Sequence, residues 1–408
     1  MQEIFQHPDF WKYVSIPFVA AVVGWSTNWV AIKLTFAPLE FIGIRPFLGW
    51  QGIIPSKAGK MAAIFVDSTM SRLGTLPELF EQMEPEKIAD QIIRVINPRL
   101  QTYTDEIVLQ ENAILWENLP SLVREQIYER IREEFPRHVN ELMDEARINV
   151  EDLIDFKEML VERLVKDKNL LNRLFLECGE EEFRFIINSG FTFGFLFGLV
   201  QLAVWIFYPA GWVLPVFGLI VGWATNWIAL NVIFRPLHPK KIGPWIFQGL
   251  FLKRQKEVAA KWCQIVTREI VTVRNIIQAM LSGSRSENTH ALIKKHIKPL
   301  VDESVGVART AAQVMVGLRG FANIKESVGE KAIHVSLEPF NHWGFNKDRA
   351  VVVERLLRER MESMPSDQFQ DLLRPCFQED EIKLILVGAV LGLLAGLAQL
   401  FFVFGGGA

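Results

Sequence analysis

The chain has 408 residues and an almost even balance of charge, with 44 Lys and Arg against 47 Asp and Glu. A formal net charge of −3 argues against the basic footprint of a nucleic-acid-binding protein, so we expect no nucleic-acid partner. Half of the residues are hydrophobic and 22% are charged, but four stretches are almost free of charge and the rest is rich in Glu, Lys and Arg. This segregation predicts a membrane protein with large soluble segments.

The four apolar stretches are each about 20 residues long, the length that a helix needs to cross a bilayer. They run from Val14 to Phe36, Ile186 to Phe207, Trp212 to Phe234 and Leu384 to Phe404. The second and fourth are clean apolar runs, whereas the first and third carry a Thr-Asn pair near the middle, and Lys33 lies near the end of the first. We predict that all four span the membrane, with tilted or incomplete crossing by the first and third as the alternative. The first is no convincing secretory signal, since it lacks a basic cluster before it and a small-residue cleavage site after it.

An internal repeat relates the two halves of the chain. Residues 23–39 read VGWSTNWVAIKLTFAPL and residues 221–237 read VGWATNWIALNVIFRPL, at an offset of 198 positions. The second and fourth stretches align at the same offset, with matched glycines at 190 and 388, 194 and 392, and 198 and 396. Two separate matches at one offset predict a tandem duplication, with copies at about 13–210 and 211–408.

Each copy reads as span, soluble helical domain, span, so the copies should be parallel and related by a pseudo-twofold axis along the membrane normal. The predicted segments are an N-terminal tail with helix 1 (1–37), helical domain 1 (38–185), helix 2 (186–208), helix 3 (212–235), helical domain 2 (236–382) and helix 4 (383–404). Lys and Arg close to the spans concentrate on the side of the two domains, which predicts that both domains are cytoplasmic.

The segments between the spans have apolar residues at helical spacing, for example Ile127, Ile131 and Phe135, and show no run of alternating strands. The fold class is therefore predicted as an all-α integral membrane protein. Several glycines between 317 and 346 predict a loop there.

The candidate intramembrane polar site consists of Thr27, Asn28, Thr225 and Asn226. Such side chains need hydrogen-bond partners in hydrocarbon. They either form a polar site at the interface of the two copies, as intramembrane polar residues often do, or hold helices together. The glycines Gly190, Gly194, Gly198, Gly388, Gly392 and Gly396 are spaced four apart, which predicts close helix packing.

Two apolar segments rich in Gly and Pro, 43–55 and 242–252, directly follow a span and carry Trp50 and Trp245. They are predicted to lie in the membrane interface. The basic residues beside them either contact anionic headgroups or simply anchor the spans on the positive side; they are Lys57, Lys60, Lys253 and Arg254.

No motif for catalysis, phosphate binding or metal binding is present, and the seven histidines and the cysteines Cys178, Cys263 and Cys376 are scattered. We therefore expect no enzyme activity, no catalytic residues, no metal and no cofactor.

The repeated G-W-x-T-N-W-x-A motif, the later G-x3-G-x3-G-L-x-Q motif, residues 374–399 and the turn Gly52-Ile53-Ile54-Pro55 together resemble a known group. The chain is similar to the YheB- and YjiN-like bacterial membrane proteins, domain-of-unknown-function family 445. The second copy departs from the turn, reading Gly249-Leu250-Phe251-Leu252. The resemblance implies a multi-pass protein of the bacterial cytoplasmic membrane with no assigned activity, and it supplies no catalytic residues.

Two functional hypotheses follow. The first is a non-enzymatic membrane anchor or scaffold whose partners are the lipid bilayer and a protein, a lipid or a second copy of the chain, bound by the helical domains. The alternative is a small transporter or channel with a polar path lined by the Thr-Asn pairs.

Overall fold

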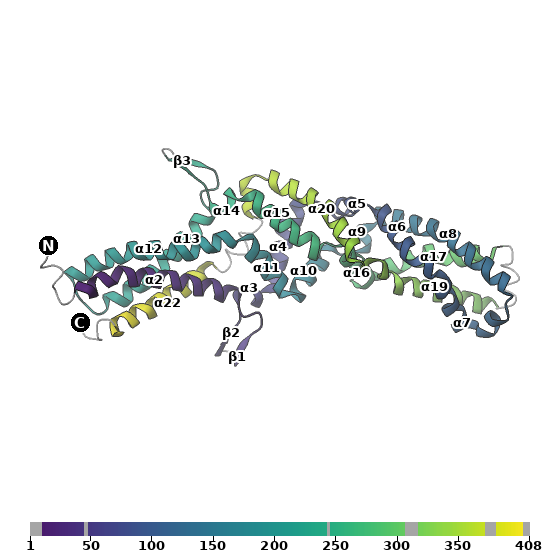
Figure 1. Cartoon of the computed structure of the whole chain (residues 1–408), viewed down its shortest axis with the longest axis horizontal. Helices are drawn as coiled ribbons and strands as arrows, with labels where there is room; N and C mark the ends of the chain where they lie inside the picture. The colour runs from purple at the N-terminus through teal and green to yellow at the C-terminus, as the bar shows by residue number, and fades with distance from the viewer. Residues whose placement is uncertain (1–9, 45–47, 243–244, 307–316, 372–380, 403–408) are drawn as a thin grey trace. The chain divides into compact units, whose positions relative to one another are not determined.

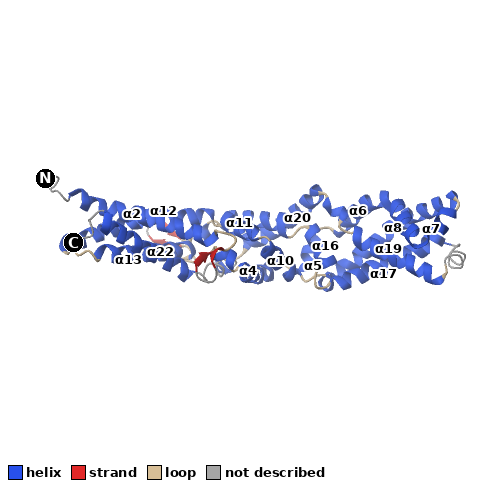
Figure 2. Cartoon of the chain, turned by 90° about the horizontal axis from the view of Figure 1, so that it is seen from below, coloured by secondary structure: helices blue, strands red, loops and turns tan. Residues whose placement is uncertain are grey.

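A computed structural model describes residues 10–44, 48–242, 245–306, 317–371 and 381–402 (Figure 1). Helices dominate these residues, with two short β-hairpins (Figure 2). The chain forms two compact units, which we call the membrane unit and the helical unit. The membrane unit comprises Met1–Thr69, Leu164–Trp262 and Arg360–Ala408, and the helical unit comprises Met70–Arg163 and Cys263–Glu359.

The membrane unit contains the four predicted spans as long helices, together with short elements that follow or precede them. The long helices are α2 (Phe10–Phe36), α12 (Glu180–Phe207), α13 (Val213–Phe234) and α22 (Glu381–Phe402). The other elements are α3 (Ile53–Ser56), α4 (Ala58–Leu73), α11 (Lys168–Cys178), α14 (Leu250–Lys253), α15 (Gln255–Ile265) and the strands β1 (Ile42–Ile44), β2 (Leu48–Trp50), β3 (Lys240–Ile242) and β4 (Trp245–Phe247).

The four long helices are long enough and apolar enough to cross a membrane. Large apolar side chains also cover their outward faces, and Phe18, Leu196 and Leu394 are each about half exposed. A helix that is apolar all round suits lipid rather than water. Helix α12 begins at Glu180, earlier than the predicted span, because Glu180 to Glu182 form an acidic first turn that favours a helix N-terminus.

The four long helices pack as two pairs, α2 with α12 and α13 with α22, and α12 also contacts α13 (Figure 1). The glycines of α12 and α22 lie in these contacts. Without a side chain at these positions the helix backbones approach closely, which is how small residues stabilise helix pairs in lipid.

A short antiparallel hairpin follows each first helix of a pair. Strand β1 pairs with β2, and β3 pairs with β4 (Figure 2). The base of each hairpin is tied back to the helix end, because Gly52 N–H donates to Pro38 O at 2.9 Å and Gly249 N–H donates to Pro236 O at 3.0 Å. Strands were not expected here. Pro residues follow the ends of α2 and α13. The apolar residues after them pair as two short strands, which satisfies the hydrogen-bonding needs of their backbone N–H and C=O groups.

Among the described residues, the helical unit contains ten α-helices or parts of them and three short non-α turns. They are α5 (Leu76–Gln82), α6 (Pro85–Ile96), η1 (Asn97–Arg99), α7 (Leu100–Asn118), α8 (Ser121–Ile148), α9 (Val150–Leu153), α10 (Phe156–Lys166), η2 (Val266–Ile270), α16 (Val273–Ser282), α17 (Ser286–Val305), α19 (Leu318–Val335), η4 (Glu338–Asn341) and α20 (Trp343–Ser363).

Four of these helices form a closed ring of neighbours: α8 contacts α17, α17 contacts α19, α19 contacts α7, and α7 contacts α8. We call this arrangement the helical tube. Each helix has an apolar stripe at a spacing of three or four residues, as in the buried side chains Ile131, Phe135 and Val139 of α8. The stripes point toward the centre of the tube, and α6, α16 and η4 pack against it.

The compact units group these segments differently from the predicted helical domains at 38–185 and 236–382, because α7 and α8 from the first segment pack with α17 and α19 from the second in one unit. A loop was expected at 317–346, but most of it is helix. Gly329 lies inside α19 because a side chain there would meet Lys294, 2.9 Å away, so this glycine serves close packing.

Helix α7 is interrupted at Asn112, whose backbone is not helical (φ −158°, ψ 78°). The side-chain oxygen of Asn112 accepts a hydrogen bond of 3.1 Å from Leu115 N–H. This bond caps the short final segment of α7 as a separate helical turn.

Candidate functional site

The first predicted site, the Thr-Asn pair of α2, is buried. Asn28 is 0% exposed, and its amide nitrogen donates a 2.8 Å hydrogen bond to Ile186 O of α12. Thr27 is also buried, and its hydroxyl donates to Gly24 O of its own helix at 3.1 Å. The pair therefore joins α2 to α12.

The second pair occupies the same place in the other helix pair. Asn226 is 4% exposed and its amide lies against Gly388 of α22. The hydroxyl of Thr225 donates to Val221 O at 2.8 Å within α13. The sequence left open whether the four residues form a joint site between the copies or hold helices together, and the structure places each Asn against the partner helix of its own copy.

The predicted glycine contacts lie at the same two helix pairs. A Cβ atom on Gly194 would lie 2.5 Å from Ala20 O of α2, and one on Gly198 would lie 2.6 Å from Pro17 Cα. In the other pair, a Cβ atom on Gly396 would lie 2.5 Å from Leu214 O. Glycine also lies opposite glycine in both pairs: Gly190 contacts Gly24 in the first, and Gly388 contacts Gly222 and Gly392 contacts Gly218 in the second.

The basic residues expected at headgroups differ in their surroundings. Lys60 and Lys253 are exposed and Lys57 is half-buried. Arg254 instead holds a protein carboxylate: its Nη1 lies 2.9 Å and 3.0 Å from the two oxygens of Glu182, whose side chain is only 4% exposed. Arg254 therefore joins the start of α15 to α12, and a contact with lipid is not needed to explain it.

The helical tube contains a partly open site that was not predicted. A cavity of 380 Å³ lies among α6, α7, α8, α16, α17 and α19, and apolar side chains make up almost all of its wall. Its size falls in the range of about 300–1,000 Å³ that is typical of small-molecule sites in proteins. Apolar cavities stay dry and take apolar ligands.

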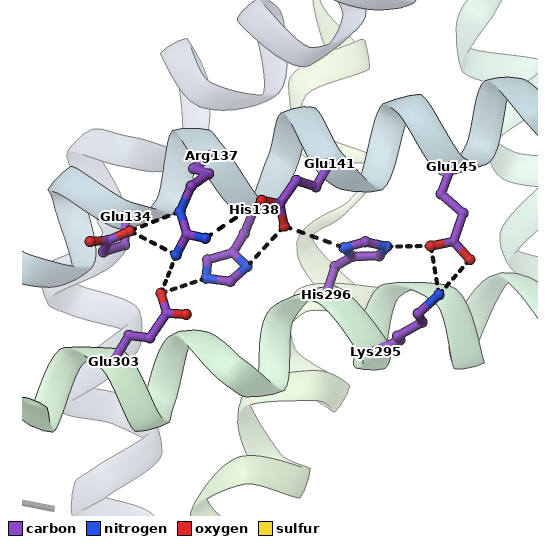
Figure 3. Close-up of polar contacts among 8 residues, drawn as sticks. All are labelled: Glu134, Arg137, His138, Glu141, Glu145, Lys295, His296 and Glu303. Carbon is purple, nitrogen blue, oxygen red and sulfur yellow. Dashed lines mark hydrogen bonds and ion pairs between the residues drawn. The ribbon is translucent and has the colours of Figure 1, made fainter.

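Polar side chains on the outside of the tube form hydrogen bonds and ion pairs between each pair of neighbouring helices, and we call each of these lines of contact a seam. Between α8 and α17 they link eight residues (Figure 3): Glu134, Arg137, His138, Glu141, Glu145, Lys295, His296 and Glu303.

The two histidines of this α8–α17 seam each contact a carboxylate on the opposite helix. His138 Nε2 lies 3.0 Å from Glu303, and His296 Nε2 lies 2.8 Å from Glu145. The Nδ1 atoms of both rings face Glu141, at 3.9 Å and 4.0 Å (Figure 3). The sequence had suggested that the histidines were isolated. Glu303 and Glu145, their partners on the opposite helix, are more than 150 positions away along the chain, and Glu141 is three residues after His138 on the same helix.

The remaining seams use similar pairs. Lys325 contacts Asp302 at 2.6 Å between α19 and α17, and Lys331 contacts Glu106 at 2.6 Å between α19 and α7. Between α7 and α8, Asp105 accepts a hydrogen bond of 2.5 Å from Tyr128 OH, and it also accepts one of 2.8 Å from Trp116 Nε1 within α7.

The seams perturb several ionisable groups. Burial raises the pKa of Glu303, but hydrogen bonds from His138 and Arg137 outweigh burial and hold that pKa below its ordinary value. Hydrogen bonds from Lys294 and Lys298 lower the pKa of Glu326 to about 2. Both carboxylates therefore remain ionised at neutral pH and keep their partners.

Comparisons with known proteins add a family context. No family model matches the chain, and no solved structure matches it. A UPF0754 membrane protein of Synechococcus sp. (strain JA-2-3B'a(2-13)) is 28% identical over 206 residues, which are 43% of this chain and 49% of the relative. A UPF0754 membrane protein of Staphylococcus haemolyticus is 24% identical over 164 residues, 39% of this chain and 42% of the relative.

A UPF0754 membrane protein of Staphylococcus epidermidis (strain ATCC 35984) is 30% identical over 132 residues, 31% of this chain and 33% of the relative. The chain spans about half the length, or less, of these curated relatives. The YheB- and YjiN-like name stays a prediction, since the relatives carry the UPF0754 name. The four apolar helices and these matches show that the chain is a membrane protein similar to bacterial UPF0754 membrane proteins.

Proposed function

We propose that this protein is a non-enzymatic, membrane-anchored binding protein. Helices α2, α12, α13 and α22 anchor it in the bacterial cytoplasmic membrane, and the helical tube binds an apolar ligand supplied by the lipid phase. The observation that carries this proposal is the 380 Å³ apolar cavity inside a tube whose outer seams are polar.

The energetic cost of an empty cavity supports a bound ligand. Fully enclosed cavities in protein cores cost about 24 cal/mol per Å³, so an empty volume of 380 Å³ that is partly open to solvent would cost at most on the order of 9 kcal/mol. The whole net stability of a protein is about 5–15 kcal/mol. Water would not recover this cost, because it needs polar partners that an apolar wall lacks. An apolar ligand recovers it by restoring the missing contacts.

The anchor part of the proposal includes the tandem duplication. Equivalent residues make equivalent contacts in the two helix pairs: Gly198 lies against Pro17, and Gly396 lies against Pro215, each at an offset of 198 positions. In this proposal the two copies are parallel, and both soluble segments face the cytoplasm because Lys and Arg gather on that side of the spans. Reporter fusions after residues 120 and 284 test the topology: both must report the cytoplasm.

A transporter lined by the Thr-Asn pairs has less support. The amide of Asn28 is committed to Ile186 O, in a contact where a side chain on Gly190 would lie 2.7 Å from the amide nitrogen. Such tight packing favours the role of holding α2 and α12 together.

Purification of the full chain from its membrane, followed by mass spectrometry of an organic extract, tests ligand binding. We expect an apolar molecule to copurify with the wild-type chain. The Ser304→Leu variant should retain much less of it, because Ser304 lines the cavity and the larger leucine side chain would occupy part of the cavity volume.

A matched control is Ser363→Leu. Ser304 and Ser363 each donate a 3.0 Å hydrogen bond to the carbonyl three residues earlier, but Ser363 is exposed on α20. The control should keep its ligand. If wild type yields no apolar molecule, and added lipid does not raise its thermal stability, the proposed function is wrong.

A further inference from the structure

The cavity is long relative to its volume. Its lining residues on α8 recur from Val123 to Ala146. At a rise of 1.5 Å per residue this stretch of helix is about 35 Å long. A volume of 380 Å³ distributed along that length is a narrow channel. One leaflet of hydrocarbon is about 15 Å thick, half of the bilayer core, so the lined stretch of α8 is longer than one extended lipid chain.

The few polar groups in the wall already have partners. Tyr103 OH donates to Glu338 at 2.9 Å, Lys331 Nζ donates to Glu106 at 2.6 Å, and Ser336 Oγ donates to Ala332 O at 2.6 Å. A polar ligand group inside the channel would lose its hydrogen bonds to water and find no free partner among these groups. The part of the ligand that lies inside is therefore hydrocarbon.

The two ends of the channel differ. At one end Phe80 and Phe340 line the wall and are each only 1% exposed. At the other end, beside the break of α7 at Asn112, Val123 lines the wall and is 37% exposed. The wall is therefore buried among aromatic side chains at the first end and partly exposed to solvent at the α7–α8 end, which makes the α7–α8 end the better candidate for the mouth.

We infer that the helical tube binds one extended hydrocarbon chain of a lipid, tail first. The methyl end lies toward Phe340, and the polar head stays at the α7–α8 end. This inference rests on the proposed function and specifies its ligand class. Phospholipids and free fatty acids share this chain chemistry, and identification of the copurified molecule separates the two sources.

The test uses the full chain in amphipol, delipidated and free of detergent. Saturated fatty acids from octanoate to stearate compete against a fluorescent fatty acid. A chain buried along the channel should bind about fourfold more tightly for each added methylene, the equivalent of about 0.8 kcal/mol, until the channel is full. Pyrene, a compact apolar molecule, serves as the comparison and should compete poorly.

A bulky substitution near the closed end should shorten the channel. Ala332 lines the channel near that end, so Ala332→Phe should narrow the channel there. The affinity for fatty acids should then stop rising at a shorter chain length than in wild type, while octanoate still binds. Ala322→Phe on the same helix is the control, because Ala322 is exposed and lies outside the cavity wall. Ala332→Leu replaces Ala332→Phe if the larger side chain prevents folding.

Three outcomes are informative. Affinity that rises with chain length, with a lower limit in the Ala332 variant alone, supports the inference. Equal binding of all chain lengths, or tight binding of pyrene, overturns the extended-chain inference and leaves the proposed function standing. Failure of every apolar probe to bind overturns both.

Discussion

Replacing Asn28 by leucine tests whether the buried amide of α2 holds two helices together. The change removes the 2.8 Å hydrogen bond to Ile186 O. That carbonyl still accepts a 3.0 Å hydrogen bond from Ser189 Oγ, so it does not become an unsatisfied group. The loss is therefore one interhelical hydrogen bond, which is worth about 0.6 kcal/mol on average and about 1.7 kcal/mol at most in membrane proteins.

The assay is equilibrium unfolding of the purified chain in mixed micelles, with Asn231→Leu as the control. The amide of Asn231 donates to Trp227 O at 2.8 Å within its own helix α13, so its loss removes no interhelical bond. We expect Asn28→Leu to be less stable than the control by about 1 kcal/mol. A variant of unchanged stability that alters ion flux into vesicles would refute the packing argument, and so would a loss above about 3 kcal/mol.

Further predictions concern packing, charge and pH. Gly194→Val places a side chain on the backbone of Ala20 and should cost about 1–3 kcal/mol in the same unfolding assay, whereas no loss would mean that the helices are not in close contact. Glu182→Gln leaves Arg254 without its buried carboxylate and should destabilise by about 3 kcal/mol, and Arg254→Met in the same chain should recover part of that loss. Because the folded-state pKa of Glu303 lies below its unfolded value of about 4.3, its contribution is complete above that pH and disappears as the pH falls through the folded pKa. Denaturant titrations from about pH 5 to about pH 2 should show this loss, and Glu303→Gln should lose less stability over the same range.

The membrane helices could be predicted from the sequence because runs of about 20 apolar residues have few other structures available to them. The burial of Asn28 and Asn226 was also predictable, since polar groups inside such runs must face another helix. Which helix each one faces depends on the pairing of α2 with α12 and α13 with α22, and spacing alone does not specify the partner.

The helical unit was harder to predict. The stripes on α8 and α17 predict two helices with a buried face, but they do not say that the faces belong together across 150 residues of sequence. The cavity could not be predicted from the sequence. The apolar spacing of Ile131, Phe135 and Val139 is the same whether these side chains pack against other side chains or line a cavity. His138 and His296 were likewise recognisable only once α8 and α17 had been placed side by side.

The origin of the tube walls in two distant segments of the chain has a consequence for synthesis. Helices α7 and α8 are complete when residue 148 leaves the ribosome, but their apolar faces stay uncovered until α17 and α19 follow, ending at Val335. At about 5–20 residues per second this interval lasts roughly 10–40 seconds. During that time the apolar faces of α7 and α8 form an open half-shell that no other helix of the tube covers. A truncated gene product ending between the two halves would keep that half-shell permanently, so it should be found with chaperones or in aggregates.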